Sequence, residues 1–189
     1  PSVERDFYTK RNNRPRSNAD IAVTDWKNIE ATNKPIPDLK GKQCVIGVDY
    51  TKINDLASVD LHFREGDIRY KISHSWLCLQ SADLKRLNIP WRQWAEEGLL
   101  TLVDDVEIKP TLITDYIFEQ MKLYDIKGVA VDSFRYALLA KALKEIGFDK
   151  ESKNLYMVRP SDIMKIVPVI DSIFVNHFFI WGDNPLLRW

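Results

Sequence analysis

Two aspartates stand directly after short apolar runs: Asp49 ends CVIGVD and Asp132 ends GVAVD. An acid at the exit of a buried strand has its carboxylate held in a fixed direction. If the two strands are neighbours, the two carboxylates converge as ligands for a pair of divalent ions about 3.5–4 Å apart. Carboxylate oxygens favour Mg²⁺ or Mn²⁺ over zinc. The alternative interpretation is that each aspartate only caps a turn or the helix that follows it.

Three further acids are weaker candidates. Asp55 lies close after Asp49, but aspartate and asparagine brace turns well, and Asn54 beside it favours that role over metal binding. Asp104 and Asp105 follow another apolar run and are expected in a solvated loop. Neither group adds to the candidate site.

Histidine and cysteine chemistry is not indicated. His62, His74 and His177 fall in separate apolar runs without zinc-ligand spacing, so partly buried structural histidines are expected. Cys44 and Cys78 are too few and too far apart for a disulfide framework. A reducing compartment, the cytoplasm, is the simplest expectation.

The elements expected around the acids form a layered α/β pattern. Strands are predicted at 44–49, 56–63, 68–79, 99–108, 127–132, 154–158 and 177–181, and helices at 81–88, 90–98, 110–124, 133–147 and 161–175. A possible short helix falls at 21–26, and Ser133 is a candidate helix N-cap. Three consecutive strands followed by alternating helices and strands favour an RNase H-like mixed sheet with flanking helices over a barrel or a doubly wound sheet.

Charge and hydropathy limit the function classes only loosely. Lysine plus arginine equals aspartate plus glutamate at 27 each, which argues neither for nor against a DNA partner. No run approaches the roughly 18 apolar residues that span a bilayer, and no signal peptide opens the chain, so no membrane association is expected. The polar segment 1–42 is predicted to be an arm or linker, and its basic run KRNNRPR is slightly better explained as a solvated linker than as a phosphate-binding arm.

The motifs together resemble the large terminase subunit of tailed bacteriophages. GVDYTKINDLASV resembles the first nuclease motif of that family and GVAVDSF the second, while PWRQWAEEGLLTLVDD and HFFIWGDNPLLRW are similar to other family segments. FYTKRNN resembles the stretch that leads out of the ATPase domain. The resemblance implies that 1–42 is an arm from the ATPase side and 43–189 is the C-terminal RNase H-like nuclease domain.

The same resemblance implies a function. The chain would belong to an endonuclease that cuts concatemeric double-stranded viral DNA during packaging in the cytoplasm of the bacterial host, with the portal protein and the small terminase subunit as partners. Asp49 and Asp132 would be its metal ligands, in a two-metal site for Mg²⁺ or Mn²⁺. One ion would activate water and the other would stabilise the leaving 3′-oxygen.

Two departures from the family pattern leave alternatives open. No GxxxxGK[ST] loop is present, which excludes a P-loop ATPase in this chain. The family's third acid lies beyond Trp189, and Asp183 is not a substitute for it, so the expected nuclease domain is truncated and its site incomplete.

One rival is a catalytically incomplete RNase H-like module that docks on the portal or on DNA. Another rival is an actin-like or chaperone-like nucleotide-binding domain. It is disfavoured because such a domain needs a glycine-containing phosphate loop after the first strand, and YTKIND contains no glycine.

Overall fold

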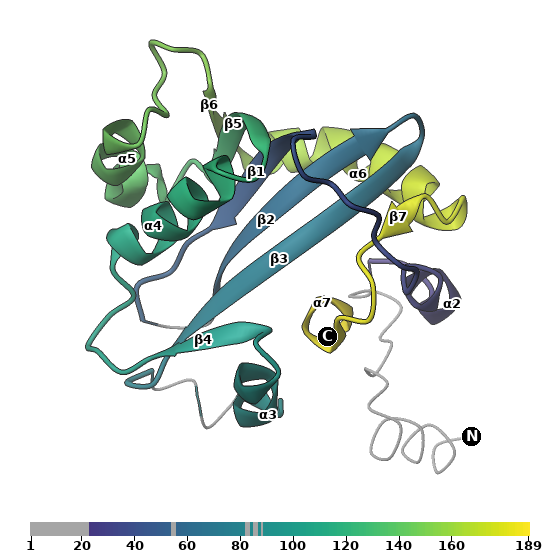
Figure 1. The fold of residues 1–189 in the computed structure, drawn as a ribbon, viewed down its shortest axis with the longest axis horizontal. Helices are drawn as coiled ribbons and strands as arrows, with labels where there is room; N and C mark the ends of the chain where they lie inside the picture. Colours follow the sequence, from purple (N-terminus) through teal and green to yellow (C-terminus); the bar gives the residue numbers. More distant parts are fainter. Residues whose placement is uncertain (1–22, 54–55, 82–83, 85–86, 88) are drawn as a thin grey trace.

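A seven-stranded mixed sheet organises the chain in the computed structural model, which describes residues 23–189 except 54–55, 82–83, 85–86 and 88 (Figure 1). The strands are β1 (Gln43–Asp49), β2 (Leu56–Glu65), β3 (Ile68–Cys78), β4 (Leu100–Val103), β5 (Asp125–Asp132), β6 (Leu155–Val158) and β7 (Phe179–Ile180). The helices are α2 (Trp26–Glu30), α3 (Trp91–Glu96), α4 (Pro110–Met121), α5 (Tyr136–Glu145), α6 (Pro160–Val175) and α7 (Pro185–Arg188). The spatial order is β4-β3-β2-β1-β5-β6, with β7 pairing β3.

The topology is that of the expected RNase H-like domain. Strands β1, β2 and β3 form an antiparallel meander, and Gly66 takes a positive φ of 59° in the tight turn between β2 and β3. Strand β5 then returns by way of α4 and pairs with β1 in parallel, and β6 pairs with β5 in parallel. Strands β4 and β7 both pair with β3 in parallel.

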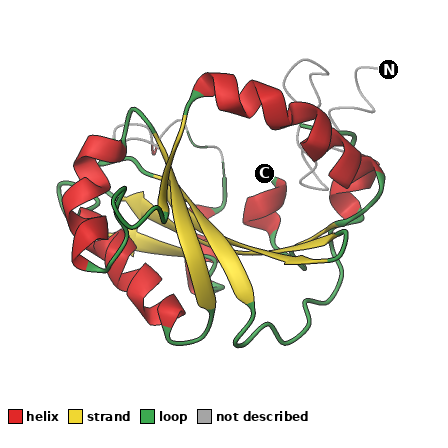
Figure 2. Ribbon diagram, turned by 90° about the horizontal axis from the view of Figure 1, so that it is seen from above, coloured by secondary structure: helices red, strands yellow, loops and turns green. Residues whose placement is uncertain are grey.

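One face of the sheet carries the main hydrophobic core beneath α4 and α5 (Figure 2). In β2 every second residue is buried, so Val59 and Leu61 point into this core while their neighbours point to the opposite face. Ile113 from α4 and Leu139 from α5 pack into the same core with no exposed surface. Each fully buried aliphatic side chain of this kind stabilises the fold by about 1.5–3 kcal/mol.

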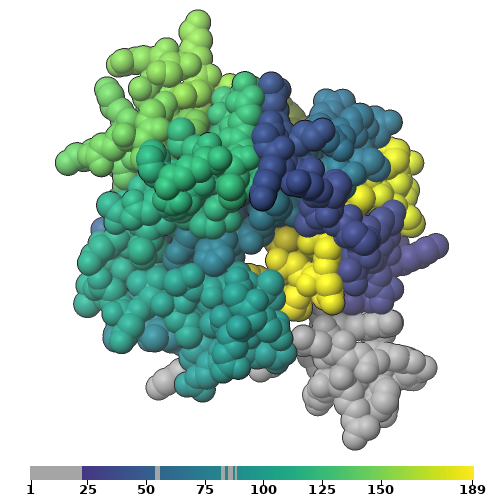
Figure 3. Space-filling view, in the orientation of Figure 1, coloured from purple at the N-terminus to yellow at the C-terminus, as the bar shows by residue number. Residues whose placement is uncertain are grey.

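Helices α2, α6 and α7 lie on the opposite side of the sheet (Figure 2). There Phe174, Phe179 and Trp181 form a smaller apolar cluster against which Ile29 of α2 packs. The backbone N–H of Trp181 donates to the Thr32 carbonyl at 3.1 Å. Figure 3 shows the purple segment that contains α2 beside the yellow C-terminal segment on the surface.

Several sequence expectations are corrected by the structure. The strand expected at 99–108 ends at Val103, and the one expected at 177–181 is reduced to β7, both short strands at the outer edge of β3. Ser133 is not the N-cap of α5, because the helix begins only at Tyr136 after a turn. The short helix α2 shares only Trp26 with the helix expected at 21–26, of which residues 21–22 lie outside the described residues. Most of the helix expected at 81–88 also falls outside the described residues.

Candidate active site

Asp49 and Asp132 lie at the carboxyl ends of two neighbouring parallel strands. Strand β1 pairs with β5 in a register that sets Val48 beside Val131, so each aspartate is the next residue along its strand. Residues in the same register of a parallel pair share a face of the sheet. Both carboxylates therefore lie on the face opposite the main core, at the carboxyl ends of two central strands.

Asp132 also braces the turn that leads into α5. One of its carboxylate oxygens, Oδ1, accepts a hydrogen bond from the backbone N–H of Phe134 at 2.9 Å, and the N–H of Ser133 donates to the Val158 carbonyl at 2.9 Å. Asp132 therefore does stabilise a turn, as the alternative interpretation of the sequence expected. This hydrogen bond fixes the direction of the carboxylate without removing it from the open face.

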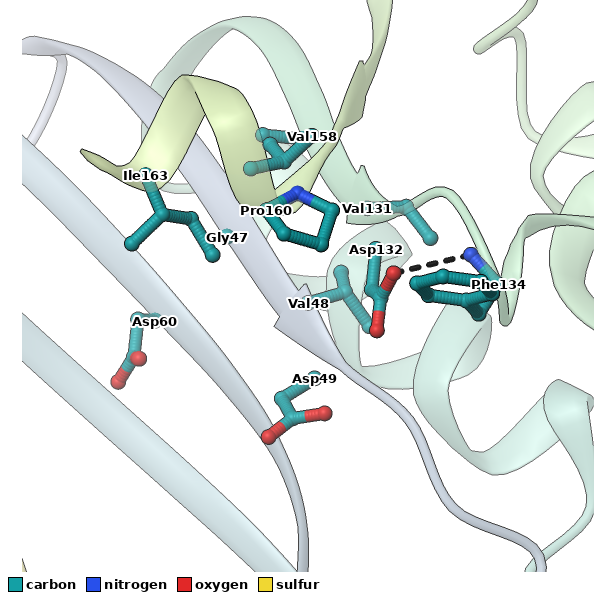
Figure 4. A pocket seen from close by; sticks show the side chains of 11 residues that line it. Gly47, Val48, Asp49, Asp60, Val131, Asp132, Phe134, Val158, Pro160 and Ile163 are labelled. Carbon is teal, nitrogen blue, oxygen red and sulfur yellow. Dashed lines mark hydrogen bonds between the residues drawn. The ribbon is translucent and has the colours of Figure 1, made fainter. Parts of the chain in front are cut away.

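An open pocket of about 360 Å³ contains both aspartates (Figure 4). It is lined by strand residues from β1, β2, β5 and β6, by the turn after β5 and by the start of α6, namely Gly47, Val48, Asp49, Asp60, Ala130, Val131, Asp132, Phe134, Val158, Pro160 and Ile163. Three of the described residues that line it are aspartates and none is basic. The pocket therefore concentrates negative charge above small and apolar side chains.

The third aspartate, Asp60, was missed in the sequence. It lies in β2 directly opposite Gly47 of β1, on the open face with the other two acids (Figure 4). Its Oδ2 atom is 3.1 Å from Nζ of Lys71, while its Oδ1 atom is buried without a hydrogen-bond partner among the described residues. The alternating pattern of β2 could have indicated its face of the sheet. Asp60 alternates with buried residues, as Ser58 and His62 do, so the three side chains point away from the main core.

The donor chemistry of the pocket fits hard divalent cations. Three carboxylates that face one pocket repel one another, and a divalent ion offsets that repulsion. Among the described residues no three histidine, cysteine, aspartate or glutamate side chains are close enough together to enclose an ion as they stand. The all-oxygen donor set and the unpartnered Oδ1 of Asp60 nevertheless suit Mg²⁺ or Mn²⁺ better than zinc.

The segment after Asp49 is tied to the loop before α4. The Tyr50 hydroxyl is buried and donates to the Ile108 carbonyl at 2.6 Å, and Ile108 donates its own N–H to the Lys52 carbonyl. Burial and the nearby Glu107 carboxylate raise the pKa of Tyr50 to about 12. These bonds anchor the chain directly after β1. They therefore help to fix the position of Asp49 at the end of that strand.

The weaker acidic candidates do not enter the pocket. Asp55 lies outside the described residues. Asp105 pairs with Lys109 at 2.6 Å and accepts the Val106 N–H, which together lower the pKa of this carboxyl. Asp104 is exposed beyond β4 and does not line the pocket.

The histidines have structural contacts. His62 packs edge-on against Phe179, and His74 stacks on Tyr116 with a ring-centroid distance of 5.1 Å. Burial lowers the pKa of both rings, and for His62 the nearby Arg69 and Lys71 lower it further. Both side chains are therefore biased towards the neutral form that suits a packing role.

Comparison with known families settles the affiliation of this fold. The family model for the terminase large subunit, endonuclease domain, matches residues 5–157. The chain belongs to this family. The match includes the strands that carry Asp49, Asp60 and Asp132 and stops before α6.

Solved structures of terminases share the fold of this nuclease domain. The large terminase of bacteriophage HK97 aligns with a TM-score of 0.74 at 20% sequence identity, over 88% of this chain and 35% of that one. The large terminase of the thermophilic bacteriophage D6E aligns with a TM-score of 0.54 at 13% identity, over 85% of this chain and 33% of that one. The chain thus spans about a third of the length of the terminases that it matches. A search of the curated proteins found no match.

No helix in the described part of the chain combines the length and the apolar character needed to cross a membrane.

Proposed function

We propose that this nuclease domain cuts double-stranded viral DNA by metal-dependent hydrolysis of the phosphodiester bond, with Asp49 and Asp132 as metal ligands. The observation that carries the proposal is the pairing of β1 with β5, which sets the two aspartates side by side on the open face of one pocket. Family membership supplies the reaction class.

The chemistry follows from charge. Mg²⁺ or Mn²⁺ ions, when bound, would neutralise the charge that develops on the phosphate and lower the pKa of the attacking water, as in two-metal nucleases. The contribution of the chain is to hold Asp49 by the anchored strand end and Asp132 by its bond to the Phe134 N–H. Carboxylates whose backbone is held in this way lose less conformational freedom when an ion binds.

The substrate and partners rest on the family and not on a contact in the structure. The proposed substrate is concatemeric viral DNA in the bacterial host, and the proposed partners are the portal protein and the small terminase subunit. The motor that moves the DNA would lie outside this chain, which has no phosphate-binding P-loop motif. Division of the chain into an arm, 1–42, and a nuclease domain, 43–189, is part of the same proposal.

Nicking of supercoiled plasmid with Mn²⁺ tests the proposal. The assay compares the chain, a version extended past Trp189, and Asp49→Asn and Asp132→Asn variants of whichever version cuts, with EDTA as the blank. Asparagine keeps the shape of each side chain and removes its charge. We expect metal-dependent cutting that falls at least 100-fold in either variant, since each removes an anionic ligand from the site.

The alternative function is a docking module for the portal or for DNA. Cutting that survives in both variants would show that the catalytic residues lie elsewhere. An inert extended protein that still binds DNA or the portal would replace the nuclease proposal with the docking module.

A further inference from the structure

Asp60 belongs to the same pocket as the two proposed ligands, although it comes from a different strand. Strand β2 pairs with β1 so that Asp60 faces Gly47 and Ser58 faces Asp49. Asp60 and Asp49 are therefore diagonal neighbours on one face, a relation that sets Cα atoms roughly 7–8 Å apart. Two aspartates at that spacing can both extend towards an ion that lies between their strands.

The floor of the pocket leaves room for such an ion. Gly47 lies between Asp60 on β2 and Ala130 on β5. A Cβ atom added at Gly47 would meet nothing within 4 Å, so the space above this strand is open. Small residues on two central strands thus form a floor, with Asp49, Asp60 and Asp132 around it (Figure 4).

The two oxygens of Asp60 have different surroundings. Oδ2 lies 3.1 Å from Nζ of Lys71, and the two side chains are only 30% and 23% exposed. Oδ1 is buried and has no hydrogen-bond partner among the described residues. A buried carboxylate oxygen without a donor is costly, and an ion or its water is one of the few groups that relieves that cost.

We propose that Asp60 is a third carboxylate of the metal site, with Oδ2 paired to Lys71 and Oδ1 left for the divalent ion, directly or through one of its waters. The inference rests on the proposed function. Lys71 is then a counter-charge that limits the negative charge of the pocket before metal binds. A competing explanation is that Asp60 and Lys71 only join β2 to β3 as an ion pair.

Mn²⁺ binding measured by titration calorimetry in the absence of DNA separates the two explanations. The proteins are the wild type, Asp60→Asn, Lys71→Gln, Asp49→Asn, Asp132→Asn and a matched control, Asp125→Asn. Asp125 forms a 2.7 Å ion pair with Lys127 on the same sheet but does not line the pocket. Unfolding by urea without metal reports the structural cost of each substitution.

We expect Asp60→Asn to weaken Mn²⁺ binding about tenfold or more, as loss of a ligand or of a group that orients one does. Lys71→Gln should leave the affinity unchanged or raise it, because it removes positive charge beside the ion. Asp125→Asn should bind as the wild type does. If Asp60→Asn does not fold, a double variant with Lys71→Gln replaces it, because neither charge is then left without its partner.

Equal effects of Asp60→Asn and Lys71→Gln, or an Asp60→Asn affinity equal to that of Asp125→Asn, would overturn the role of Asp60. In that result Asp49→Asn and Asp132→Asn still lose Mn²⁺, so the proposed function stands. A wild type that binds no Mn²⁺, or binds it equally well without Asp49 and Asp132, refutes the proposed function and the inference together.

Discussion

Replacing Gly128 by alanine should destabilise the domain, whereas the same replacement at Gly47 should not. Both glycines lie inside the central parallel strand pair, Gly128 in β5 and Gly47 in β1. A Cβ atom at Gly128 would lie 2.6 Å from the Tyr156 ring and 2.9 Å from the Asn154 carbonyl oxygen, but at Gly47 it would meet nothing within 4 Å. The two variants therefore differ in these close contacts, which only Gly128→Ala introduces.

The magnitude follows from which neighbour can move. Tyr156 is 54% exposed, so its ring can rotate away, but the Asn154 carbonyl is fixed because it accepts the Val129 N–H at 2.8 Å. Overpacking of this kind costs about 1–3 kcal/mol. Both alanines also restrict the unfolded chain, which stabilises each variant by about 0.4–1 kcal/mol and cancels when the two are compared.

Urea unfolding followed by tryptophan fluorescence measures the difference. With a slope of about 2 kcal/mol per M urea, the midpoint of Gly128→Ala should lie about 0.5–1.5 M below that of Gly47→Ala. Equal midpoints for the two variants would refute the close approach of β5 to the segment that carries Asn154. A Gly47→Ala midpoint well below that of the wild type would refute the open space above β1.

Two further predictions concern groups near the pocket. Tyr50→Phe should lower the free energy of unfolding by about 1–3 kcal/mol, because it leaves the buried Ile108 carbonyl without its donor, and urea unfolding against the wild type checks this. His62 has a pKa below its usual value, chiefly through burial and also through Arg69 and Lys71. The folded state therefore binds fewer protons than the unfolded state, so stability present above about pH 6.5 should be lost as the pH falls towards 5.5. Unfolding at both pH values should show a smaller loss in His62→Gln than in the wild type, and equal losses would contradict the assignment.

The strands that carry the proposed site were predictable because their pattern is local. CVIGVD and KGVAVD are short apolar runs that each end in an acid, and both became central parallel strands with the acid at the end. That they are neighbours follows from the RNase H-like order of elements, which the sheet confirms. The roles of Asp49 and Asp132 as ligands stay predictions.

Asp60 was not predictable in the same way. Its place beside Gly47 depends on the register of β1 against β2, and that register depends on the loop between the strands. A shift by one residue would have turned Asp60 into the main core. For Ser133 the local pattern was misleading. Serine is a good capping residue and a helical pattern follows it, but the Asp132 carboxylate accepts the Phe134 N–H in a turn there, and the helix begins only at Tyr136. The division of the chain at residue 42 stays a prediction, although Leu39, before that point, is buried in the main core.

The outer margin of β3 has a consequence for how the domain avoids aggregation. Strand β4 covers this margin at Ser75–Cys78 and β7 covers it at Arg69–Tyr70, so only 71–74 lie between the two. An exposed strand edge recruits other chains when it is long, flat and uncharged. This gap is short and contains Lys71, and the opposite margin, β6, has four residues. The longest strand of the sheet is thus protected from edge-to-edge association by two short segments that are far apart in the sequence.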